Sequence, residues 1–154
     1  MGSVSDIQVD DSLWPLIVVR FIGVPTTQQV ERYLARMTSL LERGEHHVTL
    51  YDSSRMTGMG PAEQRYQQAA WLKKHDARLR EVRLGAAYVI LSPLVRLAVG
   101  VVFYLKPPAS PYLITPTVGE AAEWTAKRLE EDGQQAAAHR IREHFGLLSR
   151  SQTG

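Results

Sequence analysis

The serines that follow the central strand of the sequence are the side chains best placed to act as a nucleophile. Ser53 and Ser54 come directly after Asp52, at the end of a predicted strand over residues 48–51. A nucleophilic serine needs a base positioned beside it, and no histidine stands next to this segment in the sequence. Aspartate and serine are also common at strand ends and turns, where their side chains bond to the backbone. We therefore predict a polar strand end and turn here.

The histidines are spaced in ways that do not suit a metal site. His46 and His47 are neighbours in a predicted strand, so their side chains point to opposite faces. His139 and His144 are five residues apart on a predicted helix, whereas two ligands on one helix are normally three or four residues apart. The chain has no cysteine, which excludes thiolate nucleophiles, disulfides and metal sites built on cysteine. The sequence predicts no metal site.

Two glycines follow the central strand as they would in a nucleotide-binding loop. Gly58 and Gly60 lie between that strand and a helix that begins at Pro61, but the third glycine of the dinucleotide motif is absent. The sequence also lacks the Gly-x-Ser-x-Gly elbow, the phosphate-binding Gly-Lys-Ser/Thr loop and the His-Glu-x-x-His motif. No group of residues supplies a nucleophile, a base and a stabilising donor together. We predict a protein that is not an enzyme and uses no cofactor.

A predicted helix over residues 93–105 is unusually apolar. Arg96 is its only charged residue, which on a water-exposed helix indicates burial on several sides or contact with a partner. The segment is too short to span a bilayer. Three interpretations stay open: a core helix packed under the C-terminal helices, a homodimer face, or a surface or pocket for a lipid-like ligand. The guanidinium of Arg96 must reach water, a carboxylate or an anionic ligand head, so Arg96 is a candidate ligand-binding residue.

The overall charge gives little indication of a partner. The 154 residues include 18 Lys and Arg and 16 Asp and Glu, a net charge of +2, so we predict no nucleic-acid binding. Basic residues gather near the end of the second predicted helix: Lys73, Lys74, His75, Arg78, Arg80 and Arg83. We expect them to form a solvated face. The alternative is a surface that binds an acidic partner or makes peripheral contact with membrane headgroups. The N-terminus lacks the pattern of a signal peptide, and we expect a cytoplasmic protein without a transmembrane segment.

Strands and helices alternate along the chain, which predicts a single α/β domain over residues 1–148 with a polar tail over 149–154. Predicted strands cover 13–21, 48–51, 84–91 and 112–115, with a weaker one at 7–9 that forms a hairpin with the first. Predicted helices follow the capping residues Thr26, Ser92 and Thr117, another runs from Pro61 to about Arg80, and one more contains Ala137, Ile141, Phe145 and Leu148. This order predicts a mainly parallel sheet of four to five strands with right-handed crossovers, flanked by helices and with an added C-terminal helix.

This order of elements, together with five short sequences, resembles a bacterial group of STAS-like proteins, which are similar to the anti-sigma factor antagonists and more distantly to the lipid-carrying CRAL-TRIO domains. The resemblance covers about residues 10 to 131 and rests on short, mainly hydrophobic segments spread along the chain. They are Val48-Thr49-Leu50-Tyr51-Asp52-Ser53-Ser54, Ala70-Trp71-Leu72, Ala86-Ala87-Tyr88-Val89-Ile90-Leu91-Ser92, Val95-Arg96 and Glu120-Ala121-Ala122-Glu123-Trp124.

The resemblance implies a domain without catalytic residues that docks onto a signalling partner. In anti-sigma factor antagonists, a kinase phosphorylates a serine at the start of the helix that follows the strand carrying an aspartate. With Asp52 as that aspartate, the acceptor position falls near Gly60 or Pro61, which cannot be phosphorylated, and we do not expect the usual phospho-switch. Ser54 and Thr57 are the nearest hydroxyls and are the candidate phospho-acceptors.

Two hypotheses for function follow. The first is a non-enzymatic docking domain in bacterial signalling, which binds a signalling protein through an exposed loop from Arg55 to Gly60 and the start of the next helix. Its predicted docking residues are Asp52, Ser54, Arg55, Met56, Thr57 and Met59. The alternative is a carrier or sensor of a hydrophobic or anionic lipid-like ligand, held against the helix at 93–105 with Arg96 near its head group.

Overall fold

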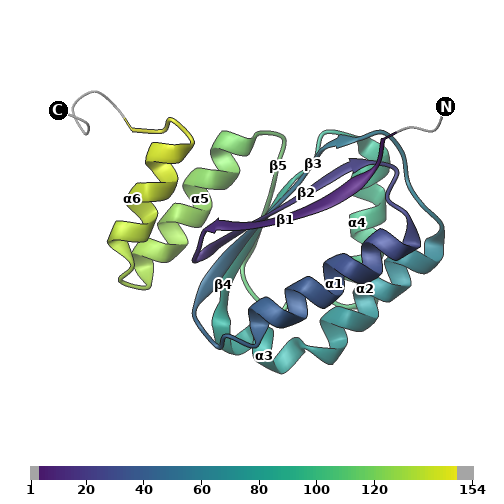
Figure 1. Ribbon diagram of the computed structural model, residues 1–154, viewed down its shortest axis with the longest axis horizontal. Coiled ribbons are helices and arrows are strands. Elements are labelled where there is room, and N and C mark those ends of the chain that lie inside the picture. The colour runs from purple at the N-terminus through teal and green to yellow at the C-terminus, as the bar shows by residue number, and fades with distance from the viewer. Residues whose placement is uncertain (1–3, 149–154) are drawn as a thin grey trace.

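A computed structural model describes residues 4–148, and its central element is a five-stranded sheet (Figure 1). The strands lie in the order β1-β2-β3-β4-β5; β1 is antiparallel to β2, and the other three pairs are parallel. The elements are, in chain order, β1 (Asp6–Leu13), β2 (Leu16–Gly23), α1 (Thr27–Leu41), β3 (His47–Met56), α2 (Ala62–Lys74), α3 (Asp76–Val82), β4 (Arg83–Val89), α4 (Pro93–Leu105), β5 (Tyr112–Thr115), α5 (Val118–Glu131) and α6 (Gln135–His144). This confirms the predicted α/β sheet, and the predicted tail over 149–154 lies outside the described residues.

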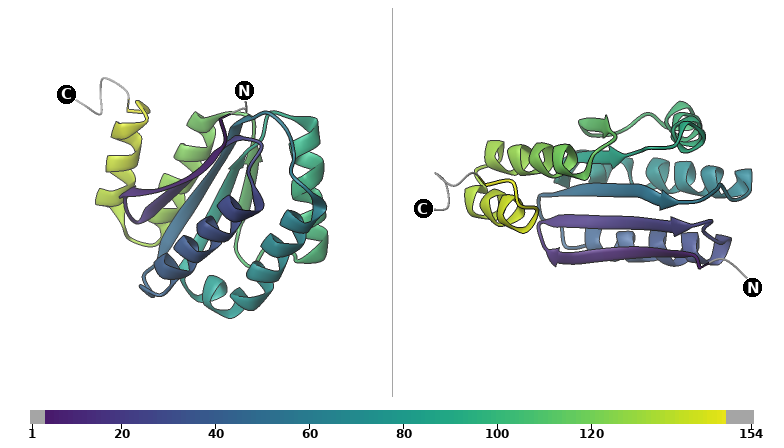
Figure 2. Two further views of the ribbon diagram at one scale, coloured as in Figure 1. Left: turned by 45° about the vertical axis from the view of Figure 1, so that its right-hand side comes forward. Right: turned by 90° about the horizontal axis from the view of Figure 1, so that it is seen from above.

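The helices cover the two faces of the sheet unequally (Figures 1 and 2). The parallel strands β2 to β5 are added in one direction, so right-handed crossovers place α1, α2, α3 and α4 on the same face. Helices α5 and α6 follow the last strand and pack on the other face, over Leu16, Val48 and Leu50. We call the side covered by α5 and α6 the closed face and the side covered by α1 to α4 the open face.

The helix starts follow from local hydrogen bonds. Thr26 and Gln29 form the predicted capping box: the Gln29 amide donates to Thr26 Oγ1 at 3.1 Å, and the Thr26 amide donates to Gln29 Oε1 at 2.9 Å. Ser92 caps α4 and Thr117 caps α5 with a single bond, each side chain accepting from the amide three residues later. These predictions are confirmed because each depends on only four neighbouring residues.

Several predicted boundaries are wrong. The strand predicted from residue 13 begins at Leu16, and β1 continues to Leu13 with a register shift against β2 after Asp10. Strand β3 runs on to Met56, because Arg55 and Met56 stay paired with the end of β2. The helix predicted up to Arg80 is broken at His75 into α2 and α3.

The apolar helix α4 does not lie under the C-terminal helices. It packs beside α2 on the open face, whereas the C-terminal helices α5 and α6 cover the closed face (Figure 2). Of the three interpretations of this helix, a core helix under the C-terminal helices is therefore wrong, because the uninterrupted strand order puts the β4–β5 crossover on the same side as the earlier ones. Among residues 4–148, no helix is long and apolar enough to cross a membrane.

Candidate functional site

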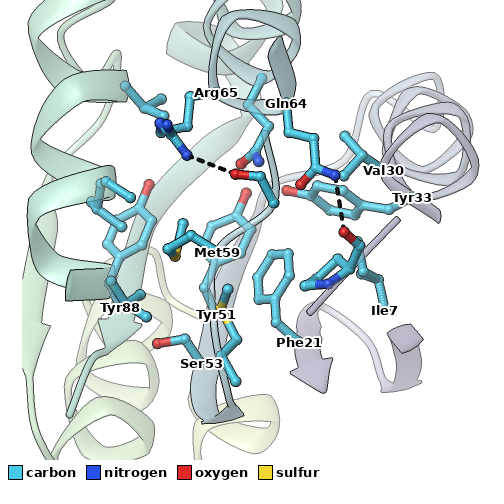
Figure 3. A pocket seen from close by; sticks show the side chains of 18 of the residues that line it. Ile7, Phe21, Val30, Tyr33, Tyr51, Ser53, Met59, Gln64, Arg65 and Tyr88 are labelled. Atoms are coloured by element: carbon cyan, nitrogen blue, oxygen red, sulfur yellow. Dashed lines mark hydrogen bonds between the residues drawn. The ribbon is translucent and has the colours of Figure 1, made fainter. Parts of the chain in front are cut away.

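A cavity separates the sheet from α1, α2 and α4 on the open face (Figure 3). Its volume is about 110 Å³, and its lining is mostly apolar. We call it the sheet cavity. It is lined by Ile7, Phe21, Pro25, Val30, Tyr33, Leu34, Tyr51, Ser53, Met56, Met59, Gly60, Gln64, Arg65, Gln68, Trp71, Leu72, Tyr88, Ile90, Val95, Ala98, Val99, Val102 and Phe103.

Aromatic rings from three neighbouring strands form the floor of the cavity. Tyr51 of β3 is in register with Tyr88 of β4, and their rings stack with centroids 4.9 Å apart. Phe21 of β2 lies on the other side of Tyr51 at 6.3 Å, and Phe103 of α4 meets the Tyr88 ring edge-on at 5.2 Å. Aligned strands place these rings side by side because alternate residues point to the same face. The floor of the cavity is therefore a row of stacked and edge-packed rings.

The polar groups of the wall are held by the backbone. The Gln64 amide nitrogen donates to the Pro25 carbonyl at 2.9 Å, which ties α2 to the start of α1 (Figure 3). Arg65 Nη1 donates to the Gly60 carbonyl at 3.3 Å, and its side chain is half-buried. The lining contains no carboxylate, so the only formal charge among the lining residues is the positive charge of Arg65.

A buried arginine lies behind the tyrosines. Arg83 is only 6% exposed, although its position in a basic stretch predicted a solvated side chain; that prediction is wrong for Arg83 because β4 begins there and directs it under α2 and α3. Its Nε donates to Thr49 Oγ1 at 3.3 Å, and its Nη2 donates to the Tyr51 hydroxyl. Its guanidinium lies 5.2 Å from the centroid of the Tyr51 ring. Among residues 4–148, no carboxylate forms an ion pair with Arg83.

Three tyrosine hydroxyls lie near this arginine. In Figure 3 the hydroxyl of Tyr33 points toward that of Tyr51, and the hydroxyls of Tyr51 and Tyr88 point the same way. Burial raises the pKa of Tyr33 and of Tyr88 above the ordinary value of a phenol. The tyrosine side of the cavity therefore carries several hydroxyl groups near the positive charge of Arg83.

The residues predicted for docking do not form one loop. Because β3 continues to Met56, four of the six predicted docking residues lie on a strand, namely Asp52, Ser54, Arg55 and Met56. Thr57 is exposed and Ser54 is half-buried, and Asp52 accepts a hydrogen bond from the Ser54 amide at 2.9 Å. The neighbouring Ser53 donates to the Val89 carbonyl at 2.6 Å, which agrees with the predicted structural role of this polar segment.

The two predicted docking methionines line the sheet cavity. Met56 and Met59 both contact its empty space, while Arg55 and Thr57 between and beside them are exposed. The segment thus has a solvent side and a cavity side. Alternation along the end of β3 explains the opposite sides of Arg55 and Met56, whereas Thr57 and Met59 lie beyond the strand.

Arg96 does not reach the sheet cavity. It lies on the outer side of α4 and borders a shallow surface depression together with Pro93, Leu97, Gly100, Val101 and Tyr104. This outer side is apolar and exposed, with Leu97 at 68% and Tyr104 at 87% exposure. The inner side of the same helix lines the cavity through Val95, Ala98, Val99, Val102 and Phe103.

The sequence analysis missed the tyrosines and Arg83. A signal was present for two of the rings, since Phe21 and Tyr88 lie near the C-terminal ends of β2 and β4, where ligands bind in many α/β sheets; Tyr51 lies in the middle of β3. Among residues 4–148, no group of three or more His, Cys, Asp or Glu side chains is arranged to hold a metal ion.

Comparison with known proteins identifies the fold. No protein-family model matches the chain, and no curated protein matches it. Among solved structures, it is similar to an uncharacterized protein of the DUF3478 family from Shewanella loihica PV-4, described as having a SpoIIAA-like fold. The two share 15% sequence identity with a TM-score of 0.59, and the match covers 81% of this chain and 98% of the other. The chain therefore has a SpoIIAA-like, STAS-type fold, as the sequence resemblance predicted.

Proposed function

We propose that the protein is a non-enzymatic binding domain that holds a small hydrophobic ligand in the sheet cavity. The observation that carries this proposal is the cavity itself, which is apolar, lined by aromatic rings and bordered by a few fixed polar groups, as small-molecule sites usually are. A packed protein interior leaves few voids larger than a water molecule, so a cavity of this size has a cost in stability that a ligand would offset.

The volume of the cavity limits the size of the ligand. An engineered apolar cavity of roughly 150 Å³ in another protein takes up benzene. The sheet cavity, at about 110 Å³, therefore suits an aromatic ring or a short aliphatic chain without rearrangement. A longer chain would extend out of the cavity or displace α4, whose inner side chains form part of the wall.

Filling the cavity tests the proposal. Ala98 lines the cavity from α4, and Ala98→Leu places three extra carbons in the empty space. We expect the wild-type protein to show amide chemical-shift changes around the cavity when titrated with benzyl alcohol or 1-hexanol, and we expect Ala98→Leu to abolish them. Ala70→Leu, on the exposed side of α2, makes the same chemical change outside the cavity and should bind like wild type. Equal binding by both variants would show that the ligand lies elsewhere.

A second proposed function is docking to a signalling protein in the bacterial cytoplasm, which the STAS-type fold supports. The exposed side chains of Arg55 and Thr57 lie on the segment whose Met56 and Met59 line the cavity, so ligand occupancy and partner binding would involve the same backbone. Substituting Met56 or Met59 would disturb the cavity as well as the docking surface. The double variant Arg55→Ala/Thr57→Ala therefore tests docking alone. We expect this variant to fail to retain a bound signalling protein during purification but still to bind benzyl alcohol. If the variant retained the bound protein, docking at this segment would be contradicted.

A further inference from the structure

We infer that the ligand of the sheet cavity is a small hydrophobic acid, whose anionic head accepts hydrogen bonds from the hydroxyls of Tyr51 and Tyr88 next to the buried guanidinium of Arg83. This inference rests on the proposed ligand-binding function and adds the chemical class of the ligand. It assigns the tyrosines and Arg83 as the polar end of the site and the rings and α4 side chains as its apolar end.

The unpaired charge of Arg83 is the first observation. A charged side chain removed from water is costly unless it is paired, and buried charges in proteins are nearly always ion-paired or bound to a counter-ion. Arg83 is 6% exposed, and within residues 4–148 its hydrogen-bond partners are the uncharged hydroxyls of Thr49 and Tyr51. A guanidinium offers five N–H donors, so these two bonds leave it without charge compensation. An anion bound nearby would supply that compensation.

The hydroxyls of the cavity are available as donors. Tyr51 lines the cavity and accepts a hydrogen bond from Arg83, and its own O–H can donate to a bound anion in place of the neighbouring Tyr33 hydroxyl. The hydroxyl of Tyr88 makes no side-chain hydrogen bond with another residue in the described part of the chain, and its ring stacks directly on that of Tyr51. Two adjacent O–H donors match the two oxygens of a carboxylate, and hydrogen bonds to an ionised group are the stronger kind.

The field of Arg83 reaches these hydroxyl positions. Burial raises the pKa of Tyr33 and Tyr88, and the charge of Arg83 acts against that rise in both residues. A negative charge at either phenol oxygen is therefore attracted by Arg83. No carboxylate lines the cavity to oppose an incoming anion.

Arg65 is the competing cation. It lines the cavity, but it is half-buried and donates to the Gly60 carbonyl, so its charge has access to water and does not need an anion. It provides a matched control, because Arg65→Met removes one positive charge from the same cavity.

The experiment compares three ligands of one size: benzoate, benzyl alcohol and benzylamine, titrated at pH 7 into the full chain by calorimetry and amide chemical shifts. We expect benzoate to bind at least about tenfold more tightly than benzyl alcohol, since a hydrogen bond to a charged group adds more than one to a neutral group. We expect benzylamine to bind most weakly of the three. Equal affinity for all three would overturn the inference and leave the proposed function intact, whereas no binding of any of them would overturn both.

Variants assign the preference to particular residues. Arg83→Met keeps an unbranched side chain and removes the charge, and we expect it to lose the preference for benzoate over benzyl alcohol. Tyr88→Phe removes one donor oxygen and should lower benzoate affinity several-fold; it gives an independent result if Arg83→Met does not fold. Loss of the preference in Arg65→Met alone, or its retention in both Arg83→Met and Tyr88→Phe, would overturn the assignment.

Discussion

The closed face of the sheet is packed with small and aliphatic side chains, whereas the open face carries aromatic rings and contains a cavity. Alanines let α5 and α6 approach the closed face, and the residues buried there include Ala121, Ala122, Ala126, Leu129 and Ile141. The open face has Phe21, Tyr33, Tyr51, Trp71 and Tyr88, with Arg83 buried among them. The closed face also holds Trp124 and Phe145, but at its margin. We therefore expect the closed face to contribute more to stability than the open face, where the sheet cavity leaves side chains with fewer packing partners.

The largest expected contrast between the faces comes from deleting one leucine on each. Leu129 is fully buried against the closed face, so Leu129→Ala should lower the free energy of unfolding by about 3–5 kcal/mol through lost burial and a new cavity. Leu72, partly buried beside the existing sheet cavity, should cost only about 1 kcal/mol when changed to alanine. Urea denaturation measures both values. Similar losses for the two variants would contradict the division between the faces.

Lowering the pH should weaken the open face. His47 stacks on Trp14 and lies on the same side of β3 as Tyr51, and burial lowers its pKa from 6.5 to about 4. The folded protein therefore keeps His47 neutral, while the unfolded chain takes up a proton as the pH falls through 6.5. Stability should decrease from pH 6.5 to about pH 4 by at most roughly 3 kcal/mol, and this residue causes no further loss at lower pH.

The pH dependence is measured by urea denaturation across this range. His47→Asn should flatten the slope between pH 4 and 6.5, and His139→Asn, at an exposed position of α6, should leave it unchanged. An unchanged slope in His47→Asn would show that other groups cause the acid sensitivity.

Gly85 tests how tightly the closed face is packed. A Cβ at this position would lie 2.6 Å from Cη2 of Trp124, a rigid ring covered by Arg128. Gly85→Ala should therefore lower stability by about 1–3 kcal/mol, which outweighs the gain of up to about 1 kcal/mol from restricting the unfolded chain. Thermal and urea unfolding would detect the change, and a more stable variant would show that Trp124 can move aside.

Gly100 makes the corresponding test on α4 and should give the smallest effect. A Cβ there meets no atom within 4 Å, so Gly100→Ala adds helix propensity without a clash. We expect a gain of about 0.5–1 kcal/mol in the free energy of unfolding, measured in urea. A loss of stability would mean that the outer side of α4 is packed against something in solution.

The sequence predicted those parts of the fold that depend on neighbouring residues. The caps at Thr26, Ser92 and Thr117 and the strand over 112–115 follow from local chemistry and are confirmed. The break at His75 was missed, because it serves to turn Leu79 and Val82 onto the sheet, a tertiary requirement that the helical pattern does not contain.

The site was less predictable than the fold. Arg83 belongs to a run of basic residues in the sequence, and its burial depends on the position at which β4 begins. The sheet cavity combines residues of β1, β2, β3, β4, α1, α2 and α4, and its volume depends on the distance between helices and sheet. Arg96 is the only charged residue of an apolar helix, which made it a candidate for ligand binding. It lies on the outer side of α4, because tertiary packing determines which side of the helix faces the cavity.

The acidic outer strand has a consequence for how the molecules behave at high concentration. Strand β1 lies at the edge of the sheet and carries Asp6, Asp10 and Asp11, with a register shift after Asp10. An exposed sheet edge is a template on which a strand of another molecule can add, and charges and irregular pairing are the common means of preventing this. Asp10 forms an ion pair with Arg20, and Asp11 forms ion pairs with Arg36 and Arg43, so two copies meeting edge to edge at β1 would crowd these charged groups on a distorted ladder. We expect this edge to resist strand addition at high protein concentration.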